Sequence, residues 1–237
     1  SWAAALLTRQ VYLPALVALV LFVFKDHRLW LKIALTMSVG IIPFLYVVFI
    51  WGGLTNPSSM QLNSGFSSSH FLAALSFTGI FILILCPKWL EIRLVVLMVI
   101  GILCAFVNFL VHPFDGFIFP MKGVTSHLFS GVVLEILLFL VRGTYLTLAI
   151  VTIFGFLRKT WENRNDIVYL YFVFAVVGIV LTHIKISSQF SSRYVVAVAP
   201  LLIVLLARQI KFNLFLILRV LIGGAIGILS LSTYIFK

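Results

Sequence analysis

Acidic residues and cysteines are scarce in this chain. Among its 237 residues, Asp and Glu together number 6, and charged residues of both signs make up only 10%. The 2 cysteines, Cys86 and Cys104, form no CxxC pattern, so the sequence predicts neither a disulfide framework nor a cysteine-bound metal. It also has no GxxxxGK(S/T), GxGxxG or HExxH motif, which argues against a nucleotide phosphate cradle and against a zinc-peptidase site.

Hydrophobic residues fill most of the remaining sequence. They make up 63% of the chain, and its mean hydropathy is +1.22. A water-soluble core of this length cannot hide so much apolar surface, whereas a bilayer accommodates it in helices that satisfy their own backbone hydrogen bonds. The sequence therefore predicts an all-α, multi-pass integral membrane protein.

The apolar runs predict about eight membrane-spanning helices in a single transmembrane domain over residues 1–237. The spans lie approximately at 11–24, 29–50, 71–86, 93–112, 127–157, 167–183, 194–210 and 213–236. The fifth is too long for one simple crossing, so we interpret it as an interfacial helix over about 126–141 followed by a short span. Glu135 and Arg142 share one helix face and would then mark the wet side of that interfacial helix.

Basic residues are distributed unequally between the two sides of the predicted membrane. Lys and Arg are enriched in cytoplasmic loops, so the side that receives ten of them is predicted to be cytoplasmic. These ten are Lys25, Arg28, Lys32, Lys88, Arg93, Arg158, Lys159, Arg164, Arg208 and Lys211. The loops at 51–70 and 113–125, and both ends of this chain, are then predicted to lie outside. This topology accounts for the net charge of +11, and no basic patch interleaved with aromatics indicates nucleic-acid binding.

The chain begins Ser1-Trp2-Ala3 and shows no signal peptide, because no charged segment precedes a short apolar stretch. An N-terminus outside the cytoplasm without such a signal favours the interpretation that this is the C-terminal part of a longer chain. Residues 1–237 would then be one transmembrane domain of that protein.

Two arginines begin predicted spans at their outer ends. Arg9 is followed by Gln10, and a guanidinium at this position can hold a lipid phosphate through a bidentate pair of hydrogen bonds. The alternative is an Arg that snorkels to the lipid headgroups. Arg193 is followed by Tyr194, with Pro200 further along the same span. This pair is either a second phosphate contact or an interfacial anchor.

Asp115 is the only carboxylate in a predicted outer loop. It is the candidate catalytic residue, because a carboxylate can accept the proton of an attacking hydroxyl as a general base. The alternative is a turn-forming Asp before Gly116. Dispersed histidines near the outer face are more typical of an interface than of a metal cluster, so no metal site is predicted.

With these positions, the chain resembles the later part of the GT-C superfamily, polytopic glycosyltransferases that use polyprenyl-phosphate-linked sugars. The matching pieces are Arg9-Gln10, the segment Trp51-Gly52-Gly53-Leu54-Thr55-Asn56-Pro57, and Ser192-Arg193-Tyr194 with Pro200. The arrangement looks most like the α-1,2-glucosyltransferases of lipid-linked oligosaccharide assembly and their prokaryotic relatives. The resemblance implies transfer of a sugar from a polyprenyl phosphate to an acceptor hydroxyl on the outer, periplasmic or luminal, face. It also implies that Arg9, Gln10, Arg193 and Tyr194 bind the lipid phosphate and that no cofactor takes part.

The sequence departs from this family in one respect. Members carry the catalytic acidic residue in the first outer loop, whereas no Asp or Glu precedes Asp26 here, and Asp26 maps to the cytoplasm. The resemblance therefore implies either a base upstream of this chain or a non-catalytic relative. The alternative function is a non-enzymatic membrane subunit that anchors or packs within a larger membrane complex. A transporter with a midplane site is disfavoured, because intramembrane polar residues are few.

Overall fold

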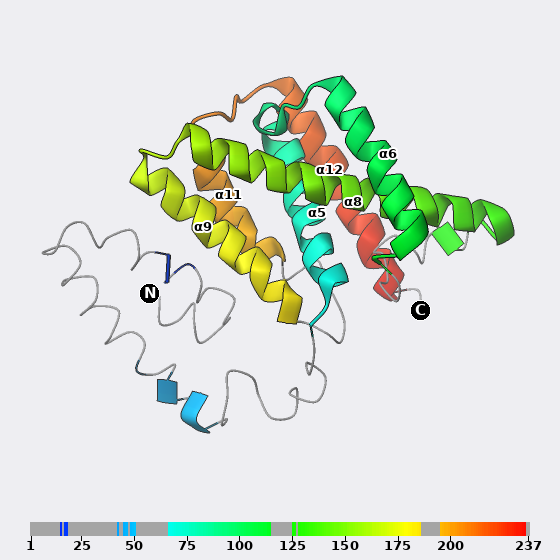
Figure 1. The fold of residues 1–237 in the computed structure, drawn as a ribbon, viewed down its shortest axis with the longest axis horizontal. Coiled ribbons are helices and arrows are strands. Elements are labelled where there is room, and N and C mark those ends of the chain that lie inside the picture. The colour runs from blue at the N-terminus through cyan, green and yellow to red at the C-terminus, as the bar shows by residue number, and fades with distance from the viewer. Residues whose placement is uncertain are drawn as a thin grey trace, which may run out of the picture.

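The computed structural model describes residues 66–114, 128–185 and 195–235, together with residues 15, 17, 18, 42, 45, 46, 48–50, 125 and 126. Every regular element in this part of the chain is a helix (Figure 1). The elements are α5 (Ser68–Leu85), η3 (Pro87–Leu90), α6 (Leu94–Val111), α8 (Gly131–Glu162), α9 (Ile167–Thr182), η4 (His183–Lys185), η5 (Val196–Val198), α11 (Ala199–Leu206) and α12 (Leu214–Ile235). The all-α prediction is therefore confirmed for the described residues.

Three of these helices, α5, α6 and α8, are long and apolar enough to cross a membrane. Helices of spanning length are what a multi-pass membrane protein requires, because about 20 residues cover the hydrocarbon core. The predicted spans at 11–24 and 29–50 lie almost entirely outside the described residues.

Local capping explains where several helices begin. The Ser67 hydroxyl accepts a hydrogen bond from the N–H of His70 and caps α5, and the Asp166 carboxylate accepts one from the N–H of Tyr169 at 3.0 Å and caps α9. Short polar side chains of this kind satisfy donors that have no partner inside the helix. At the other end of α5, Pro87 begins η3, because proline cannot donate the hydrogen bond that would continue the helix.

The helix α8 differs from the prediction for this region. It is one unbroken helix of 32 residues, so the predicted interfacial helix followed by a short span is wrong. The helix begins at Gly131, whose positive φ of 60° suits glycine. Glu135 is exposed, whereas Nε of Arg142 is buried and has no hydrogen-bond partner among the described residues. The two side chains therefore differ in their exposure. At 1.5 Å per residue α8 is about 48 Å long, and Figure 1 shows it running across α5.

The core is built around α5. Its small residues Ala73 and Ala74 are fully buried, and so is Ile82 near its C-terminus. The helix α8 packs on α5 and on α6, while α9, α11 and α12 contact α5 from other directions. In contrast, α6 buries only Cys104 and Asn108. Its other side chains form an apolar outer surface that suits hydrocarbon rather than water.

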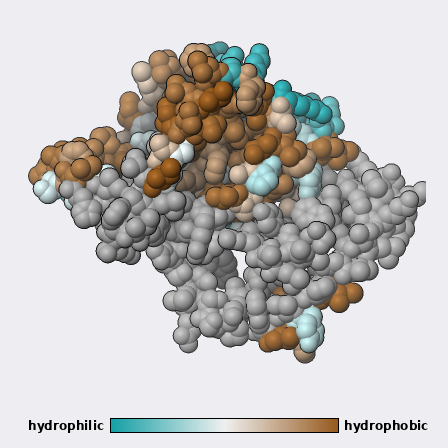
Figure 2. Space-filling model, turned by 180° about the vertical axis from the view of Figure 1, so that it is seen from behind, coloured by the Kyte–Doolittle hydropathy of each residue, from teal (hydrophilic) through white to brown (hydrophobic). Residues whose placement is uncertain are grey.

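Polar side chains gather at one end of the helices, formed by the connections 86–93, 158–166 and 207–213. We call this the basic end. A guanidinium N–H of Arg158 donates to the backbone oxygen of Glu91 at 2.6 Å, and Arg208 contacts the carboxylate of Asp166 at 3.4 Å. Figure 2 shows hydrophilic surface along the upper edge of an otherwise largely hydrophobic described surface. Connections that the charge count predicts on one side are thus brought to one end of the bundle.

Candidate functional site

The five residues predicted to carry chemistry lie outside the described residues. They are Arg9, Gln10, Asp115, Arg193 and Tyr194. Their roles in binding the lipid phosphate or in catalysis therefore stay predictions. The structure does describe the helices to which the predicted motifs are joined.

Those helices meet at the end of the bundle opposite the basic end. The N–H of Ser67, just before α5, donates to the backbone oxygen of Ile184 in η4 at 2.8 Å, so the connections 51–66 and 186–194 lead to neighbouring ends. The element η5 packs on α9, and Pro200 lies in the first turn of α11, where its missing N–H costs no hydrogen bond. Ala15, from the first predicted span, packs against Ala175 of α9.

Two histidines near this end are buried. His183 has no exposed surface, and its Nδ1 lies 3.0 Å from the backbone oxygen of Ile179. His70 is 8% exposed. Among the described residues no group of three His, Cys, Asp or Glu side chains lies close enough to hold a metal ion. Here the histidines are part of the helix packing.

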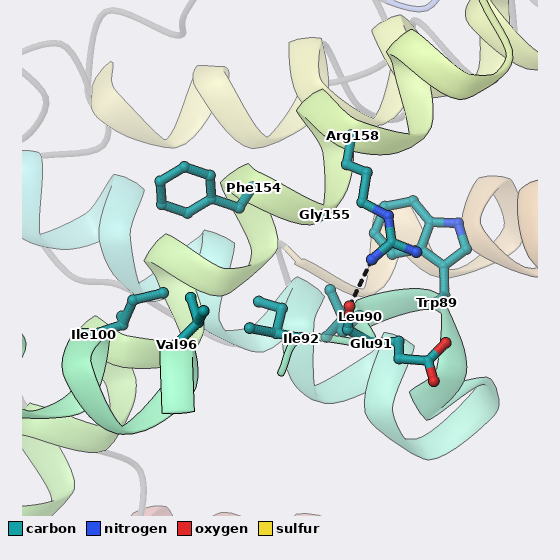
Figure 3. Close-up of a pocket in the computed structure, with 9 residues that line it drawn as sticks. All are labelled: Trp89, Leu90, Glu91, Ile92, Val96, Ile100, Phe154, Gly155 and Arg158. Atoms are coloured by element: carbon teal, nitrogen blue, oxygen red, sulfur yellow. Dashed lines mark hydrogen bonds between the residues drawn. The ribbon is translucent and has the colours of Figure 1, made fainter. Parts of the chain in front are cut away.

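A cavity of about 300 Å³ lies at the basic end, between η3, α6 and α8. Figure 3 shows the residues that line it: Trp89, Leu90, Glu91, Ile92, Val96, Ile100, Phe154, Gly155 and Arg158. We call it the Trp89 cavity. Its lining is almost entirely apolar, with the Arg158 guanidinium above it.

Trp89 is held rigidly in the wall of this cavity. It is 1% exposed, its indole N–H donates to the hydroxyl of Tyr169 at 3.1 Å, and its ring meets Phe156 edge to face at 5.0 Å. Gly155 lets α8 approach it, because a Cβ at that position would lie 2.9 Å from Cζ3 of Trp89 and 2.8 Å from Cδ2 of Leu90. The cavity is therefore a preformed feature of the packing.

Charged groups lie in the last turn of α8, beside Arg158, past the apolar run that ends at Leu157. Nε of Arg158 donates to Oε1 of Glu162 at 2.7 Å, and Nζ of Lys159 donates to Oε2 at 2.6 Å. Hydrogen bonds from Lys159 and from Arg158 lower the pKa of the Glu162 carboxyl. Arg158 and Glu162 are 46% and 42% exposed, so water screens their pair and it contributes little to stability.

Among the described residues, those that line the Trp89 cavity include no nucleophilic side chain and no pair of carboxylates. The cavity offers a ligand apolar surface and the guanidinium of Arg158. Sequence reasoning counted Arg158 only as a loop charge and missed the cavity. Arg158 and Glu91 lie 67 positions apart, and no local pattern relates two residues at such a separation.

No protein-family model, no curated protein and no solved structure matches the chain.

Proposed function

We propose that this chain is the membrane domain of a glycosyltransferase that passes a sugar from a polyprenyl phosphate to an acceptor hydroxyl. The resemblance of three short motifs to the GT-C superfamily motivates the proposal. One structural observation supports it: the segments that carry these motifs adjoin elements around α9, and two of their connections lead to one end of the bundle. A site assembled from distant segments requires such convergence.

In the proposed reaction the arginines bind the donor and a carboxylate activates the acceptor. The guanidinium groups of Arg9 and Arg193 would hold the lipid phosphate through charge-assisted, bidentate hydrogen bonds. As the bond between the anomeric carbon and the phosphate oxygen breaks, they would stabilise the negative charge on the departing polyprenyl phosphate. The acceptor oxygen forms the new bond to that carbon, and its proton passes to a carboxylate on the outer face.

The second candidate is a non-enzymatic subunit of a larger membrane complex. The observation that favours it is the apolar outer surface of α6, on which Leu94, Val95, Ile102 and Val111 are each at least 64% exposed. Another membrane helix could cover such a surface as well as lipid does. The two candidates differ in one measurable property, transfer of a sugar from a polyprenyl-phosphate donor.

Topology is the first test. We expect a cysteine at Ser59 to react with a membrane-impermeant maleimide from outside, and one at Lys88 only after the membrane is opened, because the basic connections are retained inside. The background would carry Cys86→Ala and Cys104→Ala, which remove both native thiols. Labelling of position 59 only from the cytoplasmic side would show that the topology is the reverse of the predicted one, and it would contradict the proposed outer site.

Asp115→Asn tests which carboxylate serves as base. We expect transfer to fall by less than about tenfold, because the related family carries its catalytic carboxylate in the first outer loop and an Asp before Gly116 is typical of a turn. The initial rate of transfer from a polyprenyl-phosphate sugar is the measurement. A fall of about 100- to 10,000-fold, the usual contribution of a general base, would instead make Asp115 the catalytic residue.

A further inference from the structure

The walls of the Trp89 cavity continue into the exposed apolar surface of α6. Val96, on the cavity wall, is 45% exposed, and its neighbours Leu94 and Val95 are 64% and 71% exposed on the outside of the same helix. Water is poorly held in such a space, because a buried water needs two or more polar partners. A hydrocarbon chain matches both the cavity lining and the surface outside it.

A cation with unused hydrogen-bonding capacity lies at the mouth of the cavity. The Arg158 side chain is 46% exposed. Within the described part of the chain it donates to Glu162 through Nε and to Glu91 through Nη1, whereas a guanidinium has five N–H donors. Nη2 is therefore available to an incoming acceptor.

The surroundings of Arg158 also favour an anion. The three connections of the basic end carry seven Lys and Arg against three Asp and Glu. Basic residues beside a cavity between membrane helices are the kind of surroundings that hold an anionic lipid headgroup. The apolar cavity matches a hydrocarbon chain, and the Arg158 guanidinium at its mouth matches a phosphate at the end of that chain.

We propose that the Trp89 cavity binds an anionic phospholipid, with part of one acyl chain between η3, α6 and α8 and the phosphate on Arg158. The cavity volume of about 300 Å³ is at the lower end of the range for ligand sites, which suits a segment of one chain. This site is at the opposite end of the bundle from the proposed transfer site. The proposed lipid site requires that the protein is inserted in a membrane, but it does not depend on the proposed transferase activity.

The test is lipid binding to the purified protein in detergent. Native mass spectrometry would follow titration with phosphatidylglycerol and, in parallel, with phosphatidylcholine of the same acyl chains. We expect a preference for phosphatidylglycerol of about tenfold. No preference between the two lipids would overturn the proposal. Inorganic phosphate should not compete, because it lacks the chain; full competition by it would show an anion site without lipid recognition.

Two arginine variants separate a specific contact from the general charge of the basic end. Arg158→Gln should weaken phosphatidylglycerol binding about tenfold, the value of a charged hydrogen bond near the membrane surface. Arg164 is the matched control, because it belongs to the same end but lies 4.9 Å above the ring of Trp161 and does not line the cavity. Arg164→Gln should change binding less than twofold. Equal effects of both substitutions would contradict the proposed site.

Replacing a carboxylate beside Arg158 is expected to strengthen lipid binding, and a misfolded variant would not bind more strongly. Glu162→Gln removes the anion that occupies Nε of Arg158 and should strengthen phosphatidylglycerol binding about fivefold. Asp166→Asn is the control, since it removes the same charge beside Arg208 and keeps a side chain that can cap α9. It should have a smaller effect. Weaker or unchanged binding in Glu162→Gln would count against Arg158 as the phosphate ligand.

The acyl chain is tested separately. Val96→Trp should fill part of the cavity and weaken binding of phosphatidylglycerol about tenfold or more, since each excluded methylene removes favourable burial. Val95→Trp introduces the same side chain one position away, on residue 95, which does not line the cavity, and should leave binding unchanged. Identical binding by both tryptophan variants would show that no chain occupies the cavity.

Discussion

Replacing Arg193 by alanine is expected to lower sugar transfer about 30- to 150-fold. A hydrogen bond between charged groups is worth about 2–3 kcal/mol, and its loss in the transition state appears directly in kcat/KM. Arg193 stands two positions before Val195, where a described segment begins, and Val195 is buried in the core. The measurement is the initial rate of transfer from a polyprenyl-phosphate sugar by the native protein in proteoliposomes.

Two further variants show whether the effect belongs to the guanidinium. Arg193→Lys should recover little activity, because a point charge cannot form the bidentate pair. Lys185→Ala removes a cation from η4, just before the connection that carries Arg193, and should change the rate less than twofold. Full activity in Arg193→Ala would reduce Arg193 to an interfacial anchor. Absence of transfer by the unmodified native protein would favour the non-enzymatic subunit.

Gly79→Ala is expected to destabilise the protein by about 1–3 kcal/mol, the usual cost of overpacking a core. An added Cβ at position 79 would lie 2.3 Å from Oγ1 of Thr152 and 3.5 Å from the backbone oxygen of Leu148. Thr152 is fully buried, and a β-branched side chain in a helix has few rotamers with which to move away. Thermal unfolding in detergent would measure the effect.

Gly101 provides the matched control, because nothing lies within 4 Å of a Cβ added there. Gly101→Ala should raise stability by up to about 1 kcal/mol, since alanine is the better helix former. Thr152→Ala should rescue Gly79→Ala: without Oγ1, the nearest atoms, Cβ of Thr152 at 3.7 Å and the oxygen of Leu148, make ordinary contacts. Thr152→Val keeps the branch and should not rescue. Additive effects of the Gly79 and Thr152 substitutions would show that the helices do not meet at this contact.

Helix positions agree well between sequence and structure where the apolar runs have clear ends. The runs at 93–112 and 213–236 are observed as α6, Leu94–Val111, and α12, Leu214–Ile235. These limits follow from local signals: Asn213 caps α12 through a hydrogen bond from the N–H of Leu216. Such signals involve residues within a few positions of one another and can be read from the chain directly.

The prediction failed where tertiary contacts decide the result. Arg142 and Gly143 suggested a break in α8, yet the helix continues through both, because it packs against α5 and α6 and buries Leu138 and Leu146 on either side of these two residues. The Arg219 guanidinium likewise donates to the backbone oxygen of Ile84 at 2.9 Å and satisfies a carbonyl in the last turn of α5. Nothing in the local sequence around Arg219 indicates that contact.

Membrane class, helical class and most helix limits were determined by the sequence alone, because hydropathy and capping depend on the residues within one segment. The folded arrangement decided which helices touch. Gly79 meets Thr152, and Gly155 admits Trp89, through pairs of residues that lie far apart in the chain. The Trp89 cavity and its guanidinium exist only because of those contacts, since close approach depends on the matching shapes of two helix surfaces that neither helix specifies by itself.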